Sequence, residues 1–155
     1  MTDFETVASD YYRQQQHQPG WCDLFSVVVE GMFANASEPE SLAFLRQMGE
    51  QLAQRYPLAA ATTVAVLERD INLLLARFHW GRVDIQPAGA ALIITHLALP
   101  PGDGVMAAAR WHSVLTAIFQ GLYSGWLQAQ GGDPTMTVTP QATERNDMLC
   151  FRYQR

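Results

Sequence analysis

The sequence contains no lysine, and its ten basic residues are all arginine. P-loops, Schiff-base sites and kinase-type phosphate sites each need a lysine ammonium, so these catalytic classes are excluded. Charge is also sparse, because charged residues make up 16% of the chain and its net charge is −5. A nucleic-acid partner is excluded as well, since neutralising phosphates needs a concentrated basic face and no basic run exists.

Long apolar runs and cysteines are scarce too. No apolar stretch approaches the ~18 residues of a membrane span. The acidic start, with Asp3, Glu5 and Asp10, lacks the basic and apolar segments of a secretory signal. Cys22 and Cys150 have no CxxC or Cys/His metal spacing, which favours free thiols in a reducing compartment and leaves a disulfide open. We therefore expect a cytoplasmic protein with no membrane insertion.

Hydrophobic residues nevertheless make up 48% of the chain, a composition typical of a folded protein. A length of 155 residues suits one domain with its own core. Charged side chains are too few to cover most of the solvent-exposed surface of a small monomer. Part of the apolar surface is therefore expected to be buried against other copies of the chain.

Residues 1–20 are expected to form a polar N-terminal arm. The arm contains a glutamine-rich patch and ends at Pro19-Gly20. Its pattern leaves open whether it is partly helical or a disordered tail. Residues 21–155 are expected to form a single α+β assembly domain with no internal repeat or linker.

Two helices are predicted at the start of this domain. Apolar residues recur at three- and four-residue spacing over residues 21–33 and again over residues 42–56. Ser37 and Glu40 have the spacing of a capping box, which places the start of the second helix there.

A third helix is predicted from Thr62 or Thr63, with Gly81 as its C-cap. After Gly81 the apolar period changes to two. This change predicts a β-hairpin over residues 83–97, with Pro87-Ala88-Gly89 as its turn.

A long helix is predicted over residues 105–130, followed by two short strands around Val138 and over residues 149–153. The predicted order is N-terminal helices, a β-hairpin, a long helix and two C-terminal strands. Segregated elements of this kind indicate an α+β fold with a small antiparallel sheet.

The residue types that carry catalysis form no recognisable constellation. The four histidines have no i,i+4 pair, and Glu68 and Asp70 lie on different faces of one helix. The segment from Gly121 to Gly125 places Ser124 one residue out of phase with a nucleophile elbow. We predict that the chain is not an enzyme and has no catalytic residue, metal site or cofactor.

Three stretches, in order, resemble the family of bacterial cellulose synthase operon protein D. One covers Arg46, Met48-Gly49 and Leu52-Ala53-Gln54-Arg55. The other two run from Ile71-Asn72-Leu73-Leu74 through His79-Trp80-Gly81-Arg82-Val83-Asp84, and over Gln120-Gly121-Leu122-Tyr123-Ser124-Gly125-Trp126. The resemblance covers roughly residues 21–153.

The resemblance implies a non-catalytic subunit that assembles into a ring-like octamer built from dimers and helps order glucan chains into crystalline cellulose. Its implied partners are itself, other cellulose synthase subunits and β-1,4-glucan. Glucan emerges on the periplasmic side of the inner membrane, so the periplasm is the alternative location. A cytoplasmic subunit could act by arranging synthase complexes in rows.

In that family the N-terminal segment lines the glucan passages, and here that segment differs from the family pattern. Candidate glucan contacts are therefore chosen by chemistry, since aromatic rings stack on sugars and amides bond hydroxyls. The candidates are Phe4, Tyr11, Tyr12 and Gln15.

The apolar face of the long helix is expected in the core or at a subunit interface. The candidate assembly residues are Trp111, Gly121, Tyr123 and Trp126. Two alternatives stay open: a dimeric adaptor whose sheet edge recruits a peptide, and a small-molecule sensor unrelated to cellulose. The sensor alternative predicts a substantial apolar cavity between the long helices and the sheet, with a few convergent polar groups and with His79 or His96 facing it.

Overall fold

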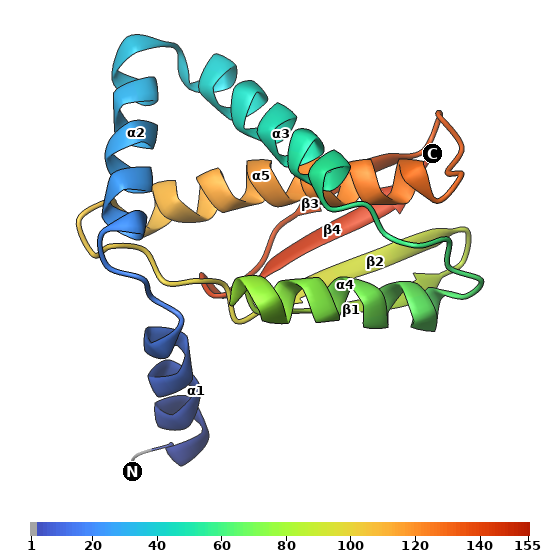
Figure 1. The fold of residues 1–155 in the computed structure, drawn as a ribbon, viewed down its shortest axis with the longest axis horizontal. Helices are drawn as coiled ribbons and strands as arrows, with labels where there is room; N and C mark the ends of the chain where they lie inside the picture. The colour runs from blue at the N-terminus through green and yellow to red at the C-terminus, as the bar shows by residue number, and fades with distance from the viewer. Residues whose placement is uncertain (1–2) are drawn as a thin grey trace.

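A computed structural model describes residues 3–155 (Figure 1). It contains five helices, α1 (Phe4–Gln15), α2 (Trp21–Asn35), α3 (Glu38–Arg55), α4 (Val64–Phe78) and α5 (Ala108–Ala129). Its four strands are β1 (Arg82–Ala88), β2 (Ala91–Leu97), β3 (Thr137–Gln141) and β4 (Leu149–Gln154). The predicted α+β class and the order of the elements within the domain are confirmed.

Two helix starts follow from their capping residues. The Ser37 hydroxyl accepts from the Glu40 backbone amide at 3.3 Å, and the Glu40 carboxylate accepts from the Ser37 backbone amide at 3.1 Å. This reciprocal pair is the predicted capping box of α3. The Thr63 hydroxyl is the N-cap of α4, where it accepts from the Val66 amide at 3.2 Å.

The predicted C-cap of α4 was wrong by two residues. His79 follows the helix in the left-handed conformation, with φ 58°, and the Trp80 amide donates to the Leu75 carbonyl at 3.0 Å. Gly81 also has a positive φ of 94°, but it lies at the entry to β1. A side chain at Gly81 would collide with the backbone of Leu97 and Ala98, so the glycine permits close packing rather than capping.

The hairpin is confirmed, but its turn was placed too early. Pro87 and Ala88 belong to β1, and the two-residue loop is Gly89-Ala90, with Gly89 at φ 64°. The long helix begins at Ala108, later than predicted. One Asp103 carboxylate oxygen accepts from the amides of Val105 and Met106 at 3.0 and 2.9 Å, which holds these residues in a turn.

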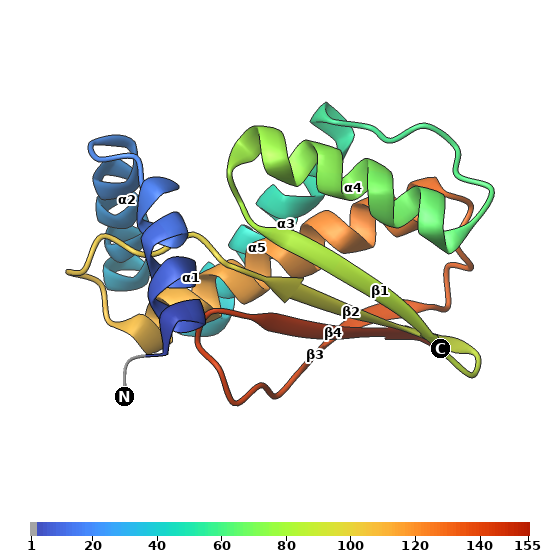
Figure 2. The same ribbon diagram turned by 90° about the horizontal axis from the view of Figure 1, so that it is seen from below.

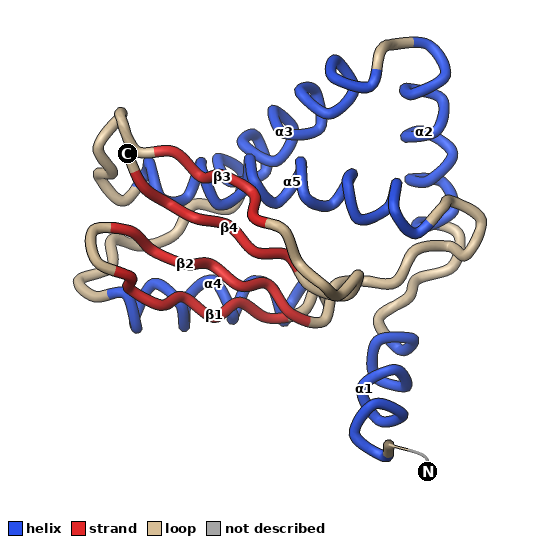
Figure 3. Tube along the Cα trace, turned by 180° about the vertical axis from the view of Figure 1, so that it is seen from behind, coloured by secondary structure: helices blue, strands red, loops and turns tan. Residues whose placement is uncertain are grey.

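The four strands form one antiparallel sheet in the order β1-β2-β4-β3 (Figure 3). Alternate residues of β4, namely Leu149, Phe151 and Tyr153, are buried, and the residues between them are half-buried. Figure 2 shows helices α4 and α5 lying on one side of this sheet. One face of the sheet therefore forms the core, as the period of two predicts.

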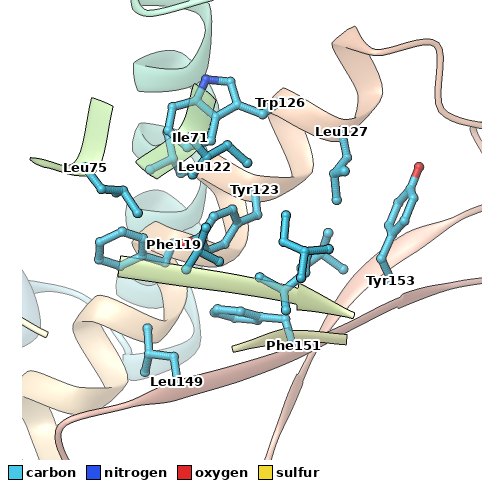
Figure 4. Close-up of a cluster of buried hydrophobic side chains, with 14 of the residues drawn as sticks. Ile71, Leu75, Phe119, Leu122, Tyr123, Trp126, Leu127, Leu149, Phe151 and Tyr153 are labelled. Carbon is cyan, nitrogen blue, oxygen red and sulfur yellow. The ribbon is translucent and has the colours of Figure 1, made fainter. Parts of the chain in front are cut away.

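Aromatic residues of α5 occupy the centre of the core (Figure 4). Tyr123 packs edge-on against Phe151 with ring centroids 5.8 Å apart, and it also contacts Phe119 and Trp126. The Trp126 indole N–H donates to the Tyr56 carbonyl at 2.9 Å, so its polar atom is satisfied. α5 is thus the central helix, a position that its all-round apolar sequence requires.

Candidate functional site

Helix α1 carries the candidate glucan contacts on its surface. It projects away from the sheet in Figure 1 and has no buried residue. Phe4, Tyr11 and Gln15 lie on one face at helical spacing, and Tyr12 is beside them, with its ring centroid 5.5 Å from that of Tyr11. The exposed fractions of Phe4 and Tyr12 are 81% and 67%. Residues 3–15 of the arm are therefore a helix-bearing segment; Met1 and Thr2 of the predicted arm lie outside the described residues.

The arm contacts the domain at its C-terminal end. The Arg13 Nε donates to the Leu99 carbonyl at 3.3 Å, and Gly20, with φ 85°, separates α1 from α2. Positive φ suits glycine, so the Pro19-Gly20 break predicted from the sequence falls where the chain changes direction. The aromatic positions are upstream of this anchor and remain exposed.

Helix α2 has a large exposed apolar surface that sequence reasoning missed. Only Ser26 and Val29 of this helix are buried, whereas the exposed fractions of Trp21 and Val27 are 73% and 69%. Leu24 and Val28 are also more than half exposed. We call Trp21, Leu24, Val27 and Val28 the α2 apolar surface. Its signal in the sequence was a helix with apolar residues on every side, which normally indicates burial all round.

Three of the four candidate assembly residues lie inside the chain. Tyr123 and Trp126 are 1% exposed, and Gly121 lies directly against the Arg46 carbonyl of α3. Trp111 is half-buried, and its indole N–H donates to the Pro100 carbonyl at 2.9 Å. The structure brings these residues together within one chain, so Gly121, Tyr123 and Trp126 present no surface to a second copy.

The buried His96 belongs to a closed hydrogen-bond network. Its Nε2 lies 2.6 Å from the Trp80 carbonyl oxygen and its Nδ1 lies 2.5 Å from the Tyr123 hydroxyl. A carbonyl can only accept, so Nε2 carries the proton and Nδ1 accepts from Tyr123. Burial lowers the pKa of His96 to about 4, against the opposing effect of the Trp80 carbonyl, and burial raises the pKa of Tyr123. Both groups are neutral and structural at neutral pH.

The other reactive side chains do not converge. Among residues 3–155, no three His, Cys, Asp or Glu side chains lie together in a way that could hold a metal ion. Both cysteines are free thiols, and burial, with Asp103 and Asp23 nearby, raises the pKa of Cys22. Such a thiol is a poor nucleophile at neutral pH. No helix in the described part of the chain combines the length and apolar character needed to cross a membrane.

A cavity of about 580 Å³ lies between the start of α2, α3 and α5. Its wall is mainly apolar and aromatic, with His79 and the segment Gln16-His17-Gln18 among the polar contributors. This cavity is not the one that the sensor alternative predicted between the long helices and the sheet, because none of the described strands contributes to its wall. His79 does line this cavity. His96 does not line it, because Tyr123 and Trp80 enclose both of its ring nitrogens.

The edge strand β1 offers little to a peptide. The Asn72 side chain bonds both the amide and the carbonyl of Val83, and the Glu68 carboxylate accepts from the Ile85 amide at 2.8 Å. The next outward position of β1 is Pro87, which has no N–H. Strand addition, which the adaptor alternative required, therefore finds no free donor at these three positions of β1.

Comparison with solved structures supports the fold alone. The chain is similar to a trafficking protein particle complex subunit 3 from Naegleria fowleri, solved covalently bound to palmitic acid, with a TM-score of 0.54 and 12% identity. The similarity covers 96% of this chain and 95% of that one. The whole α+β arrangement, including the N-terminal helices, thus recurs in a solved protein.

Comparison with known sequences identifies the family. The chain is 32% identical over 91 residues to cellulose synthase operon protein D of Komagataeibacter xylinus and of Komagataeibacter sucrofermentans. These alignments cover 57% of this chain, and they span about half, 56%, of the length of the relatives. The model of the family described as the D subunit of cellulose synthase matches residues 7–154. The chain therefore belongs to the family of the cellulose synthase D subunit.

Proposed function

We propose that this chain is a non-catalytic subunit that assembles with itself into an octamer built from dimers and helps order glucan chains into crystalline cellulose fibrils. The observation that carries the proposal is the joint exposure of the α2 apolar surface and of the aromatic residues on α1. Membership of the family supports a role of the chain in cellulose synthesis and argues against a domain unrelated to cellulose.

Self-assembly is supported by the α2 apolar surface. Leaving Trp21, Leu24, Val27 and Val28 in water forfeits about 25 cal/mol per Å² of apolar area, which contact with another copy would recover. An exposed tryptophan amid aliphatic side chains is the usual composition of an interface centre. The low content of charged residues also supports self-assembly, because charged side chains, which oppose association, cover little of the surface.

Glucan contact is assigned to α1. Its exposed rings supply flat apolar faces for the axial C–H groups of glucose, and Gln15 supplies an amide for hydroxyls. A projecting helix can reach the interior of a ring of subunits while α2 and the domain form its wall. Ordering would follow from weak, repeated stacking without bond cleavage.

Other cellulose synthase subunits are the natural protein partners for a member of this family. We propose a location on the cytoplasmic side of the inner membrane, with the periplasmic side as the alternative, and both cysteines are free as a reducing compartment requires. A C-terminal alkaline phosphatase fusion tests this location. Phosphatase activity in intact cells would place the subunit in the periplasm instead.

Light scattering of the purified chain is expected to give about 138 kDa, eight times the chain mass of 17.3 kDa. Leu24→Ser should reduce this mass, since it places a hydroxyl on the α2 apolar surface. Leu73→Ser on α4 is the matched control, because Leu73 is also more than half exposed but lies on another helix. A monomer for the unchanged chain, or equal effects of the two variants, would contradict assembly through α2.

Combined Tyr11→Ala and Tyr12→Ala substitution is expected to weaken binding of cellopentaose about 5- to 150-fold, since each stacked ring contributes roughly 0.5–1.5 kcal/mol. The rings bury nothing inside the chain, so oligomer mass and unfolding should not change. Tyr11→Phe with Tyr12→Phe retains the aromatic faces and should retain binding. Calorimetry with both variants checks this, and undiminished binding by the alanine variant would remove α1 from the glucan site.

A further inference from the structure

The cavity between α2, α3 and α5 has no part in the proposed glucan contact, although Trp21 and Val28 of its wall also belong to the α2 apolar surface. In Figure 1 these helices form three sides of a triangle, and the cavity of about 580 Å³ lies against all three. The cavity opens to solvent, because Trp21 and Val28 of its wall are more than half exposed. Its volume lies within the range of about 300–1,000 Å³ that is typical of ligand sites.

The wall of the cavity selects against sugars. Trp21, Phe25, Trp80, Trp111 and Phe119 contribute aromatic faces, and most other lining residues are aliphatic or methionine. A sugar has a hydroxyl on nearly every carbon, and each would lose its water without finding a partner on such a wall. An alkyl chain has no such requirement. Water also binds poorly there, because an apolar wall offers it few hydrogen-bond partners.

One part of the wall is polar and unsatisfied. Gln16 Oε1 and His17 Nδ1 are buried atoms without a hydrogen-bond partner in the described structure, and both residues line the cavity. They are consecutive residues at the connection between α1 and α2, so they mark a single polar end. Leaving such atoms unpaired costs about 1–3 kcal/mol each. A ligand with a polar head at this end would satisfy them.

We propose that this cavity binds a single long acyl chain, with the chain among the aromatic and aliphatic side chains and its oxygen-bearing head group at Gln16 and His17. The alkyl part of the ligand matches the apolar wall of the cavity, and its head group would supply a hydrogen-bond partner to the two unpaired polar atoms. Gln18, Cys22 and His79 are the other polar residues of the wall. The ligand is held without a covalent bond, since the pKa of the Cys22 thiol is raised rather than lowered.

Tryptophan fluorescence offers a direct test on the full-length oligomer. Three of the four tryptophans, Trp21, Trp80 and Trp111, line the cavity. Dibrominated stearic acid is expected to quench their emission saturably, and ordinary stearic acid should compete. For saturated fatty acids from eight to sixteen carbons, the Kd should fall about fourfold per added methylene until the cavity is full.

Val28→Trp is expected to reduce stearic acid binding at least tenfold, because Val28 lines the cavity and is more than half exposed, so a larger side chain can enter without disturbing the core. Val105→Trp is the matched control at another exposed valine outside the cavity. Gln16→Leu should weaken binding several-fold. Gln14→Leu should not, because Gln14 lies on α1 and outside the wall.

The results separate the possible occupants. Flotation of the chain with phosphatidylglycerol vesicles, lost in Val28→Trp, would identify a membrane lipid as the source of the acyl chain. Binding of free acid without flotation would identify a free fatty acid. Unsaturable quenching, or equal binding by Val28→Trp and Val105→Trp, would overturn the proposal. Val28 also belongs to the α2 apolar surface, so Leu24→Ser, which changes that surface outside the cavity, is a second control and should retain stearic acid binding. Loss of binding in Leu24→Ser as well as in Val28→Trp would overturn the proposal, because binding would then depend on assembly and not on the cavity.

Discussion

Replacing Gly121 by alanine is expected to lower the free energy of unfolding by about 3 kcal/mol. A Cβ at this position would overlap the Arg46 carbonyl and approach the Glu50 amide, which are backbone atoms of α3. A backbone cannot rotate out of the way as a side chain can, so α3 would have to move away from α5. The contacts along the whole crossing would loosen with it, and urea denaturation measures the loss.

Gly31→Ala in α2 is the matched control for this prediction. Gly31 is also inside a helix, but a Cβ there would meet nothing within 4 Å. Removing a helical glycine in open space should stabilise the chain by about 0.5–1 kcal/mol. The two variants therefore differ in sign, provided that light scattering shows equal oligomer mass. A loss below about 1 kcal/mol in Gly121→Ala would mean that the two helices can separate at little cost.

The helix crossing shows what the sequence could predict and what it could not. Gly121 was predicted as an assembly residue, and both Gly49 and Gly121 lie at the crossing of α3 and α5. On each helix a second small residue follows four positions later, Ala53 and Gly125, and a Cβ on Gly125 would collide with that of Ala53. The identity of the partner could not be predicted, because a glycine shows only that something comes near. Here the partner is another helix of the same chain.

Local sequence patterns predicted the helices and strands of the domain, with errors of a few residues at their ends. Capping boxes and apolar periods involve residues within one turn or one strand, so Ser37, Thr63 and the hairpin were found from their neighbours alone. The C-cap of α4 was misplaced because His79 adopts a positive φ that is rare outside glycine and asparagine. Gly81 is needed for a contact with Leu97, sixteen residues away, which no local pattern records.

The candidate surfaces were harder to predict than the elements. An aromatic residue at an apolar helical position can face the core or a partner, and the period is the same in both cases. Tyr123 and Trp126 were therefore grouped with Trp111, although they are buried in the core of the chain. Trp21 and Val27 are exposed because α3 and α5 cover only one side of α2. That difference depends on tertiary packing, which the apolar pattern of α2 does not encode.

The free energy of unfolding is expected to fall by about 2 kcal/mol between pH 7 and pH 5 through His96 alone. Burial lowers the pKa of His96 to about 4, from an ordinary value of 6.5. In the unfolded chain the imidazole takes up a proton as the pH falls below 6.5, whereas in the folded chain it stays neutral until about pH 4. The contribution of neutral His96 to the free energy of unfolding is therefore fully present above pH 6.5. That contribution is lost progressively down to about pH 4 and totals about 3 kcal/mol.

His96→Gln separates this effect from the carboxylates. Asp103 and Asp147 have pKa values lowered by hydrogen bonds, so their contributions are lost mainly at more acidic pH. Glutamine can still bond the Trp80 carbonyl and the Tyr123 hydroxyl but does not titrate. The variant should be less stable at pH 7, through imperfect packing, and its unfolding free energy should change little between pH 7 and pH 5. His112→Gln retains His96 and should keep the full decrease.

An equal decrease in His96→Gln and in the unchanged chain would contradict this assignment. The result bears on the cavity, because His96 holds Trp80 of the α4–β1 connection to Tyr123 of α5. Trp80 also lines the cavity, and Trp111 and Phe119 of the same wall come from α5. Charging His96 strains the packing between these two walls from the core side. Acidification to about pH 4, where His96 of the folded chain takes up a proton, should therefore weaken stearic acid binding in the unchanged chain more than in His96→Gln, with fluorescence quenching as the measurement.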